Sequence, residues 1–333
     1  EDVAKIYHRQ HEVHLEHFER TIKAQLGNMT YSIIIPHYNI PKLLSRCLRS
    51  IPEREDVQVI VVDDWSEGRE TFLETIPELH RSNVEFYIAD KHAGGGHARN
   101  YGLEKAKGKY LIFADADDFF NICFEEILDE YKDSDADMIF FNANSVYTED
   151  YTRCNRADHL NRFISSYYAS ANDAEMLLRY SFGEPWSRII KHSMVKENGI
   201  VFHETRIHND TAFTYRAAHC AKSIQVDRRA AYCITERFGS VSRQKSVDLM
   251  LASVDVFAKK NRFLMDNHIH FYDDTLLISL AYCQQHSSGG VFRKAMQIVA
   301  DYGLDVKETR RKLFLYRLNR KYKTIKRDLK AKI

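Results

Sequence analysis

The stretch Tyr110-Leu-Ile-Phe-Ala-Asp-Ala-Asp-Asp118 joins an apolar run to a cluster of acidic residues. Residues 110–114 have the composition of a buried strand, and Asp115 and Asp117 leave its end on the same side because side chains alternate along an extended backbone. Two carboxylates placed in this way can bind one hard divalent cation through oxygen. The alternative is a turn whose aspartates cap a helix that begins near Phe119. The stretch by itself leaves both interpretations open.

The segments around this strand alternate between short apolar runs and amphipathic stretches. Their lengths are typical of buried strands and of the helices that cover them. This alternation predicts right-handed crossovers and an α/β fold, in which a mostly parallel sheet carries helices on both faces. The predicted strands are 32–35, 57–62, 84–88, 110–114 and 138–142, and the predicted helices are 40–51, 69–79, 97–106 and 124–131.

The pattern divides the chain into three regions. Residues 1–29 are charged, rich in histidine and spaced as a loose amphipathic helix, which predicts a helical extension before the main domain. Residues 30–245 form that domain, with a regular half at 30–145 and a less regular half at 146–245. The less regular half shows helix signals at 174–180 and 211–219 and strand signals at 223–227 and 231–235. Residues 246–333 are predicted to be helical and end in a basic tail.

Composition excludes some classes of protein. The 333 residues are 44% hydrophobic with a net charge of +1, which predicts a folded protein and gives no support to nucleic-acid binding. The six cysteines are scattered without paired spacing, which favours a reducing compartment. The sequence contains no apolar run of membrane-spanning length and no signal-peptide pattern. We therefore expect a cytoplasmic protein.

The tail is strongly basic. From residue 306 onward it has twelve Lys or Arg against two Asp or Glu. Apolar residues at Leu313, Tyr316, Ile325 and Leu329 stand among these charges, a pattern typical of a helix at a membrane interface. This predicts a peripheral contact with the inner face of the cytoplasmic membrane. The alternatives are a solvated basic helix or a homo-oligomer formed through the helical ends.

Polar residues follow the first three predicted strands. In a parallel sheet, ligands bind beyond the carboxyl ends of the strands, so these residues are candidates for a binding site. They are Pro36-His-Tyr-Asn39, Asp63-Asp-Trp-Ser66 and the stretch 90–96, which ends in three glycines. The glycines let a backbone approach a ligand, and the helix that starts there favours anions. The loop matches neither a Walker motif nor a GxGxxG fingerprint after the first strand, and a flexible loop is the alternative.

Four motifs in this order resemble those of the inverting family 2 glycosyltransferases of the GT-A fold. They are Ser32-Ile-Ile-Ile-Pro-His-Tyr-Asn39, Val59-Ile-Val-Val-Asp-Asp-Trp-Ser66, Gly94-Gly-Gly-His-Ala-Arg-Asn-Tyr-Gly-Leu103 and Gly108-Lys-Tyr-Leu-Ile-Phe-Ala-Asp-Ala-Asp-Asp118. The resemblance covers about residues 31–244. Its later blocks are similar to those of bacterial transferases that build surface polysaccharides. It implies that 30–145 is the nucleotide-binding half of the domain and 146–245 the acceptor half.

The resemblance also implies a site for a nucleotide-sugar donor, usually a UDP-sugar, with Mn²⁺ or Mg²⁺. Asp64 matches the position that contacts the nucleobase, and Asp117 matches the direct metal ligand. Asp115 matches the acid that faces the ribose or supports the metal. The nucleotide-binding and metal residues implied in this way are Pro36, Tyr38, Asp64, Gly95, Arg99, Asp115 and Asp117.

Asp210 matches the general base of the family. Inversion at the anomeric carbon is a single displacement, so one carboxylate must take the proton of the acceptor hydroxyl while a metal neutralises the leaving diphosphate. The family commonly has Glu-Asp at this point, whereas this chain has His208-Asn-Asp210 and lacks the supporting acid. The alternative is that Asp210 caps the predicted helix 211–219.

Four residues are predicted to contact the acceptor. Trp186 could stack on a sugar ring, although a lone tryptophan after proline is as often a packing residue. Arg237 and Arg243 could reach a phosphate from a loop over the site, and a solvated turn is their alternative. His208 is a candidate for a further ligand or for a contact with the acceptor.

The sequence therefore predicts a metal-dependent inverting glycosyltransferase. It would move a hexose or N-acetylhexosamine from a UDP-sugar onto a bacterial surface glycan or its lipid-linked precursor. One alternative is a non-catalytic scaffold that keeps the fold and binds nucleotide or carbohydrate. Another is a nucleotidyltransferase, which would need a loop rich in glycine and basic residues after the first strand, where this chain has Pro36-His-Tyr-Asn39.

Overall fold

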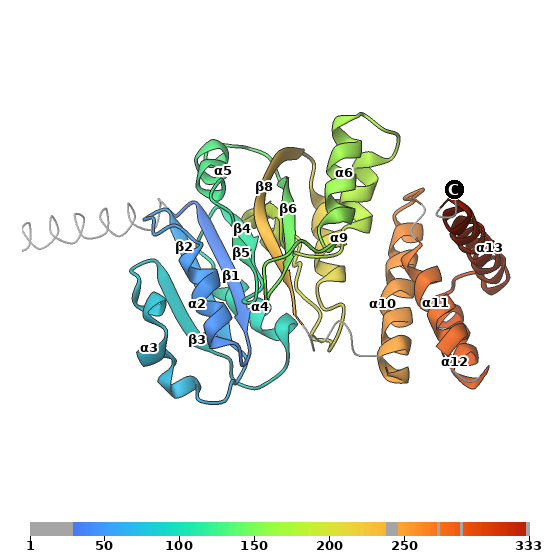
Figure 1. The fold of residues 1–333 in the computed structure, drawn as a ribbon, viewed down its shortest axis with the longest axis horizontal. Coiled ribbons are helices and arrows are strands. Elements are labelled where there is room, and N and C mark those ends of the chain that lie inside the picture. Colours follow the sequence, from blue (N-terminus) through green and yellow to red (C-terminus); the bar gives the residue numbers. More distant parts are fainter. Residues whose placement is uncertain (1–28, 238–245, 272–273, 287–288, 331–333) are drawn as a thin grey trace, which may run out of the picture.

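The computed structural model describes residues 29–237, 246–271, 274–286 and 289–330 (Figure 1). The helix predicted within residues 1–28 lies outside these ranges, and so does Arg243. Two bodies are visible, an α/β domain built on one sheet and a bundle of helices beside it.

The first half of the sheet is parallel. Its strands are β1 (Tyr31–His37), β2 (Val57–Asp63), β3 (Val84–Ile88) and β4 (Tyr110–Phe113), in the order β3-β2-β1-β4. The side chains of β2 and β4 are buried throughout, as expected for strands covered on both faces. The sequence prediction of these four strands is confirmed to within two residues at each end.

The helices of this half follow the prediction with one exception. The helices α2 (Pro41–Arg49), α4 (Gly95–Lys105) and α5 (Phe124–Tyr131) lie where the pattern places them. The helix predicted at 69–79 is instead three short pieces, the 3-10 turn Arg69–Thr71, α3 (Phe72–Thr75) and the 3-10 turn Pro77–His80. Pro77 explains the break, because it pushes the preceding residue out of the helical region and Ile76 has φ −120° and ψ 90°.

The second half of the sheet is mixed. Strand β7 (Arg188–Lys191) lies antiparallel between β4 and β6 (Met138–Tyr147), and β8 (Ile224–Glu236) lies parallel to β6. The short β5 (Phe119–Phe120) pairs with the far edge of β8. The two strands predicted at 223–227 and 231–235 are thus one strand, whose register shifts opposite residues 141–143. Within the described ranges four of the seven strand pairings are parallel. The predicted α/β fold with a mostly parallel sheet is therefore confirmed, although β5 and β7 were not predicted.

Helices complete the domain. They are α6 (Asp158–Tyr168), α7 (Ala174–Met176) continued by a π-helical turn at Leu177–Ser181, α8 (His192–Glu197) and α9 (Thr211–Cys220). Helix α9 is buried almost all round, and its Phe213 stacks on Phe202 with ring centroids 4.0 Å apart. The loop that enters α9 is thereby fixed to the core.

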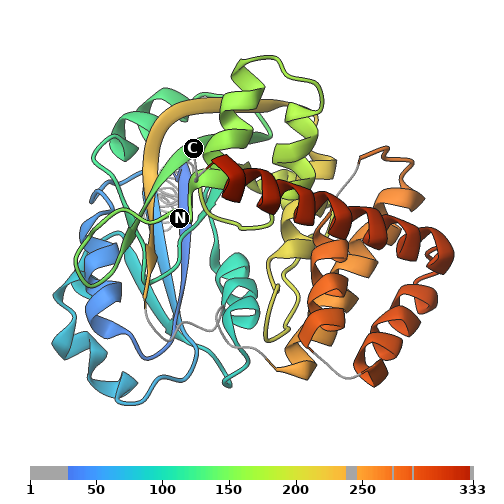
Figure 2. The same cartoon turned by 45° about the vertical axis from the view of Figure 1, so that its right-hand side comes forward.

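The helical region has a core of its own. Its members are α10 (Val247–Asp266), α11 (Thr275–His286), α12 (Gly289–Asp301) and α13 (Val306–Lys330), and their buried side chains form a cluster separate from that of the sheet. Helix α10 lies nearest to the α/β domain, where Leu264 packs with residues of α9, and α13 lies on the outside (Figures 1 and 2). Among the residues that the structure describes, no helix is long and apolar enough to cross a membrane.

Helix α13 corrects one prediction. Leu313 is only 3% exposed and Tyr316 packs against the helical core, so these two residues do not face outward as predicted for a membrane contact. The side chains of Ile325 and Leu329 lie outside the described part of the chain. The described hydrophobic side chains that α13 does expose are Phe314, Leu315, Leu318 and Tyr322.

Candidate functional site

A large cleft of about 1340 Å³ lies beyond the carboxyl ends of β1, β2 and β4. Its far wall is formed by α10 and α11, so the helical region and the α/β domain enclose it together. Nearly all the residues that the sequence predicted for the site line this one cleft. They are Pro36, Tyr38, Asp64, Gly95, Arg99, Asp115, Asp117, His208, Asp210 and Arg237.

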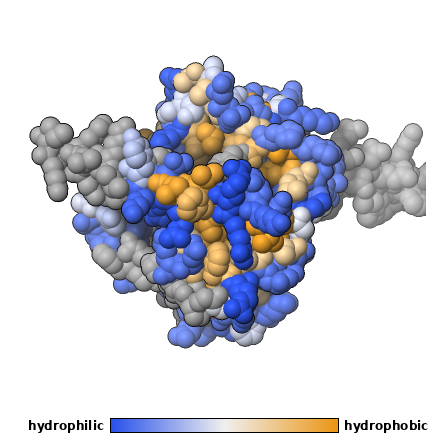
Figure 3. All heavy atoms as spheres, turned by 90° about the vertical axis from the view of Figure 1, so that its right-hand side faces the viewer, coloured by the Kyte–Doolittle hydropathy of each residue, from blue (hydrophilic) through white to orange (hydrophobic). Residues whose placement is uncertain are grey.

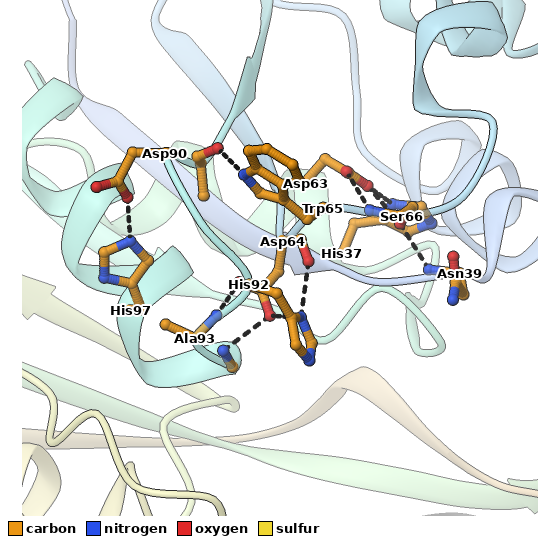
Figure 4. A network of polar contacts seen from close by, with 12 residues as sticks. His37, Asn39, Asp63, Asp64, Trp65, Ser66, Asp90, His92, Ala93 and His97 are labelled. Carbon is orange, nitrogen blue, oxygen red and sulfur yellow. Dashed lines mark hydrogen bonds and ion pairs between the residues drawn. The ribbon is translucent and has the colours of Figure 1, made fainter.

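One end of the cleft is an aromatic and acidic pocket. Tyr38 is 45% exposed and stacks on His92, with ring centroids 4.5 Å apart. The Asp64 carboxylate accepts hydrogen bonds from the amides of Ala93 (2.9 Å) and Gly94 (2.8 Å) and contacts the His92 ring at 2.9 Å (Figure 4). Asp64 therefore fixes the start of the glycine loop and also faces the cleft. His92 was not identified from the sequence, which gives a loop histidine no distinguishing signal.

The neighbouring acid, Asp63, has a structural role. Its carboxylate accepts hydrogen bonds from the amide (2.8 Å) and the hydroxyl (2.6 Å) of Ser66 and contacts His37 Nδ1 at 2.7 Å. His37 Nε2 accepts from the Ile40 amide at 3.1 Å, which places the ring proton on Nδ1, where it donates to Asp63. Ser66 in turn accepts from the Asn39 amide at 2.7 Å (Figure 4). This series of buried hydrogen bonds connects the loop after β2 to the loop after β1.

The glycine loop brings helix α4 close to the opposite side of the cleft. Gly94 has φ +90°, a conformation that side chains disfavour, and α4 begins at the next residue. The first amides of a helix have no partner within it, so this end can bind an anion. At Gly96 a Cβ atom would lie 2.1 Å from the His203 carbonyl oxygen and 3.0 Å from Asn209 Cβ. Only glycine permits this approach of α4 to the loop that carries Asp210.

We therefore expect Gly96→Ala to lower the free energy of unfolding by about 1–3 kcal/mol, because the added methyl group must push the backbone at His203 away. Urea unfolding measures this loss. Gly183→Ala is the matched control, since Gly183 also lines the cleft but its Cβ would meet only Thr211 Oγ1 at an ordinary 3.8 Å. Equal stability of the two variants would show that the loop yields to the methyl group without cost.

The acidic cluster has the donor set of a divalent cation site. Oxygen atoms of Asp115, Asp117 and Asp118 lie within 4.8 Å of one another. Asp118 is 2% exposed, and its two oxygens accept hydrogen bonds from the Thr235 amide and the Tyr232 hydroxyl. Asp115 and Asp117 line the cleft. Burial and the nearby Asp115 raise the pKa of Asp117. Carboxylate oxygens grouped in this way fit a hard cation such as Mn²⁺ or Mg²⁺.

Two arginines contact these carboxylates. Arg99 Nη2 donates to Asp115 at 2.6 Å, and its Nη1 donates to the Asn209 side chain at 2.9 Å. Arg99 therefore connects the end of β4 to the residue before Asp210. Arg237 Nε lies 3.3 Å from Asp117, at the acidic end of the cleft.

The Asp210 side chain is half-buried and does not cap the helix that follows it. Asp210 occupies the N-cap position of α9, but its side chain makes no capping hydrogen bond, so the structure does not favour the capping alternative. Burial raises the pKa of Asp210 to about 6, although the Arg99 guanidinium opposes this shift. A carboxylate with such a pKa is ionised near pH 7 and basic enough to take a proton.

The loop before Asp210 is held by the helical region. His208 has φ 52°, its Nε2 lies 3.0 Å from Ser253 Oγ, and its ring packs edge-on against Phe257 with centroids 4.9 Å apart. Both partners belong to α10. Helix α10 thus shapes the site as well as enclosing it, which the sequence did not reveal because nothing local marks a contact between residues 45 positions apart.

Trp186 does not line the cleft. It is 2% exposed and stacks on Tyr232, with ring centroids 5.8 Å apart and planes at 15°. Trp186 is therefore a packing residue, as the alternative had it, and is too buried to stack on an acceptor sugar. Trp186 supports the site indirectly, because the Tyr232 hydroxyl accepts from the Asp115 amide and donates to Asp118. Tyr232 was missed from the sequence, where it stands as an ordinary strand residue.

Comparison with known proteins is consistent with this geometry. The model of the family described as glycosyl transferase family 2 matches residues 32–209, more than half of the chain. The chain belongs to this family. The resemblance noted from the motifs is thereby confirmed.

Curated relatives come from bacteria. Glycosyltransferase GlyA of Streptococcus pneumoniae is 23% identical over 273 residues, which are 75% of this chain and 38% of that protein. Poly(ribitol-phosphate) beta-glucosyltransferase of Bacillus spizizenii is 28% identical over 211 residues, which are 60% of this chain and 31% of that protein. The chain thus spans about a third of the length of these relatives.

Solved structures share the fold. Residues 1–349 of Staphylococcus aureus TarS in complex with UDP-GlcNAc match with a TM-score of 0.54 and 19% identity, over 85% of this chain and 92% of that one. The mannosyltransferase PcManGT from Pyrobaculum calidifontis in complex with GDP-Man and Mn²⁺ matches with a TM-score of 0.51 and 16% identity, over 88% and 83%. The GT-A fold predicted from the sequence is confirmed by these matches.

Proposed function

We propose that this family 2 protein is a metal-dependent inverting glycosyltransferase that uses a UDP-sugar and acts on a bacterial cell-wall polymer, a surface glycan or a lipid-linked precursor. One observation carries the proposal. A single cleft brings together the pocket of Tyr38 and Asp64, the acidic pair Asp115 and Asp117, and the half-buried Asp210. The relatives support the choice of substrates, since one acts by name on poly(ribitol-phosphate) and a structural neighbour was solved with UDP-GlcNAc.

The pocket at the ends of β1 and β2 would hold the nucleoside. Tyr38 offers an exposed ring face on which a base can stack, and the Asp64 carboxylate can accept from a base N–H. The diphosphate would then lie between the start of α4 and the pair Asp115 and Asp117. These two carboxylates would hold Mn²⁺ or Mg²⁺, which neutralises the charge that develops on the leaving diphosphate.

Asp210 would act as the general base. The acceptor oxygen forms a bond to the anomeric carbon, the bond from that carbon to the UDP oxygen breaks with its electron pair, and the acceptor proton moves to the Asp210 carboxylate. Arg99 positions both ends of this reaction, because it binds Asp115 with one nitrogen and Asn209 with the other. His208 and Arg237 line the same cleft and remain our candidates for contacts with the acceptor or the donor phosphates.

A thermal-shift screen tests the choice of donor. We expect UDP-sugars in the presence of Mn²⁺ to raise the melting temperature, by about 4 °C for a chain of this size at a concentration a hundredfold above the dissociation constant. UDP-glucose, UDP-galactose, UDP-GlcNAc and GDP-mannose should be compared, followed by product mass with the donor that binds. Stabilisation by GDP-mannose alone would contradict the UDP assignment, and binding without turnover on any acceptor would favour the scaffold alternative.

A further inference from the structure

A second cavity, of about 420 Å³, lies in the helical region between α11, α12 and α13. It shares no lining residue with the cleft of the α/β domain. Three of its seven lining residues are arginines, namely Arg293 from α12 and Arg310 and Arg317 from α13. The other lining residues are Gln284, Phe292, Leu313 and Phe314.

The three arginines are not neutralised within the described part of the chain. No described carboxylate forms an ion pair with any of them, and Arg317 donates to the neutral Gln284 side chain at 2.7 Å. The acid nearest in sequence, Glu308, is paired with Arg311 at 2.6 Å and with Lys312 at 3.8 Å. Arginines that line one cavity without carboxylate partners offer the positive charge and the hydrogen-bond donors that a phosphate group binds.

The surroundings of the cavity are apolar. Leu313 and Phe314 both line it, and they are 3% and 63% exposed. From Phe314 an exposed stripe continues along α13 through Leu315, Leu318 and Tyr322, which are 44%, 49% and 65% exposed. Figure 3 shows this side of the molecule, where hydrophobic patches lie directly beside the most hydrophilic residues. A ligand that suits both features carries a phosphate and hydrocarbon together.

We propose that this cavity binds the phosphate of an anionic membrane lipid while the exposed stripe of α13 lies in the bilayer interface. Charge favours a membrane over a second copy of the chain as the occupant. Residues 306–322 contain seven Lys or Arg and one Glu, so two such helices placed face to face would repel each other, whereas an anionic bilayer attracts each of them. The exposed position of α13 leaves the stripe accessible to a flat surface. The sequence predicted that Leu313 and Tyr316 contact the membrane, whereas the structure exposes a different face of α13 and adds a cavity for the lipid phosphate. Membrane binding of this kind does not depend on the proposed catalysis.

Vesicle sedimentation of the full chain tests the proposal. We expect binding to vesicles of phosphatidylglycerol and phosphatidylcholine to be at least tenfold tighter than binding to phosphatidylcholine alone. The double variant Arg310→Gln with Arg317→Gln should bind the anionic vesicles at least tenfold more weakly than the wild type. The control pair Arg311→Gln and Lys312→Gln removes the same charge from the same helix outside the cavity and should weaken binding far less. Phe314→Ser should also weaken binding, although it leaves the charge unchanged.

Several outcomes would overturn the proposal. Equal losses in the two double variants would indicate adsorption by charge alone, without a site. Stabilisation of the protein by inorganic phosphate with no binding to either vesicle would assign the cavity to a soluble phosphate. A dimer in light scattering that Phe314→Ser dissociates would make the stripe a contact between copies. Melting temperatures of all variants should match that of the wild type, because every substituted side chain is exposed.

Discussion

Asp210→Asn is expected to lower the rate of sugar transfer by about 10²–10⁴-fold while leaving the binding of the UDP-sugar intact. The substitution keeps the size of the side chain but removes the group that would take the acceptor proton. The side chain makes no capping hydrogen bond to α9, so its loss should not unfold the loop. Transfer is measured as UDP release in the presence of acceptor, and binding as the thermal shift with donor.

The pH profile provides an independent reading of the same residue. In the proposed mechanism the carboxylate form of Asp210 is the active one, and burial raises its pKa to about 6. Transfer should therefore level off above pH 6 and fall about tenfold for each pH unit below it, whereas an ordinary aspartate would stay active to about pH 4. Asp158→Asn on α6 removes a carboxylate outside the cleft and should change neither rate nor profile. Turnover by Asp210→Asn at the wild-type rate would exclude Asp210 as the base.

The sequence predicted the half of the site that local patterns encode. A buried strand followed by polar residues places those residues at one edge of a parallel sheet, and this rule located Pro36, Asp64 and Asp115. The glycines at 94–96 were also informative from the local sequence. Gly94 has a positive φ and Gly96 leaves no space for a side chain, and each of these demands is met by a single glycine.

The other half depends on contacts between distant segments. Tyr232 matters because β8 passes beside the end of β4, and this placement depends on the unpredicted antiparallel strand β7. The wall of the cleft that α10 forms also depends on contacts between distant segments. Ser253 and Phe257 occupy ordinary positions of an amphipathic helix, and only docking of the helical region brings them to His208. No periodicity or composition distinguishes such residues from neighbours that face solvent.

Asp117→Asn is expected to abolish most of the metal-dependent activity, by about 10³-fold, which corresponds to about 4 kcal/mol of transition-state stabilisation. Asp117 lines the cleft, and its carboxylate lies close to that of Asp115, so the two could bind a cation together. Chelation should reduce the wild type to the level of the variant. Mn²⁺ should strengthen the binding of a UDP-sugar to the wild type and no longer do so for the variant.

The neighbouring Asp118 separates loss of the metal from loss of the fold. Asp118→Ala removes a buried carboxylate that accepts from Tyr232 at 2.9 Å and from the Thr235 amide at 2.6 Å. Leaving these two donors unsatisfied should lower the free energy of unfolding by about 2–4 kcal/mol. Asp117→Asn should instead have the same free energy of unfolding as the wild type, because burial and the nearby Asp115 already make the negative charge of Asp117 unfavourable. If Asp117→Asn keeps full turnover and the wild type is indifferent to chelator, the acidic cluster is a structural turn, and its aspartates act only by holding the end of β4 against β8.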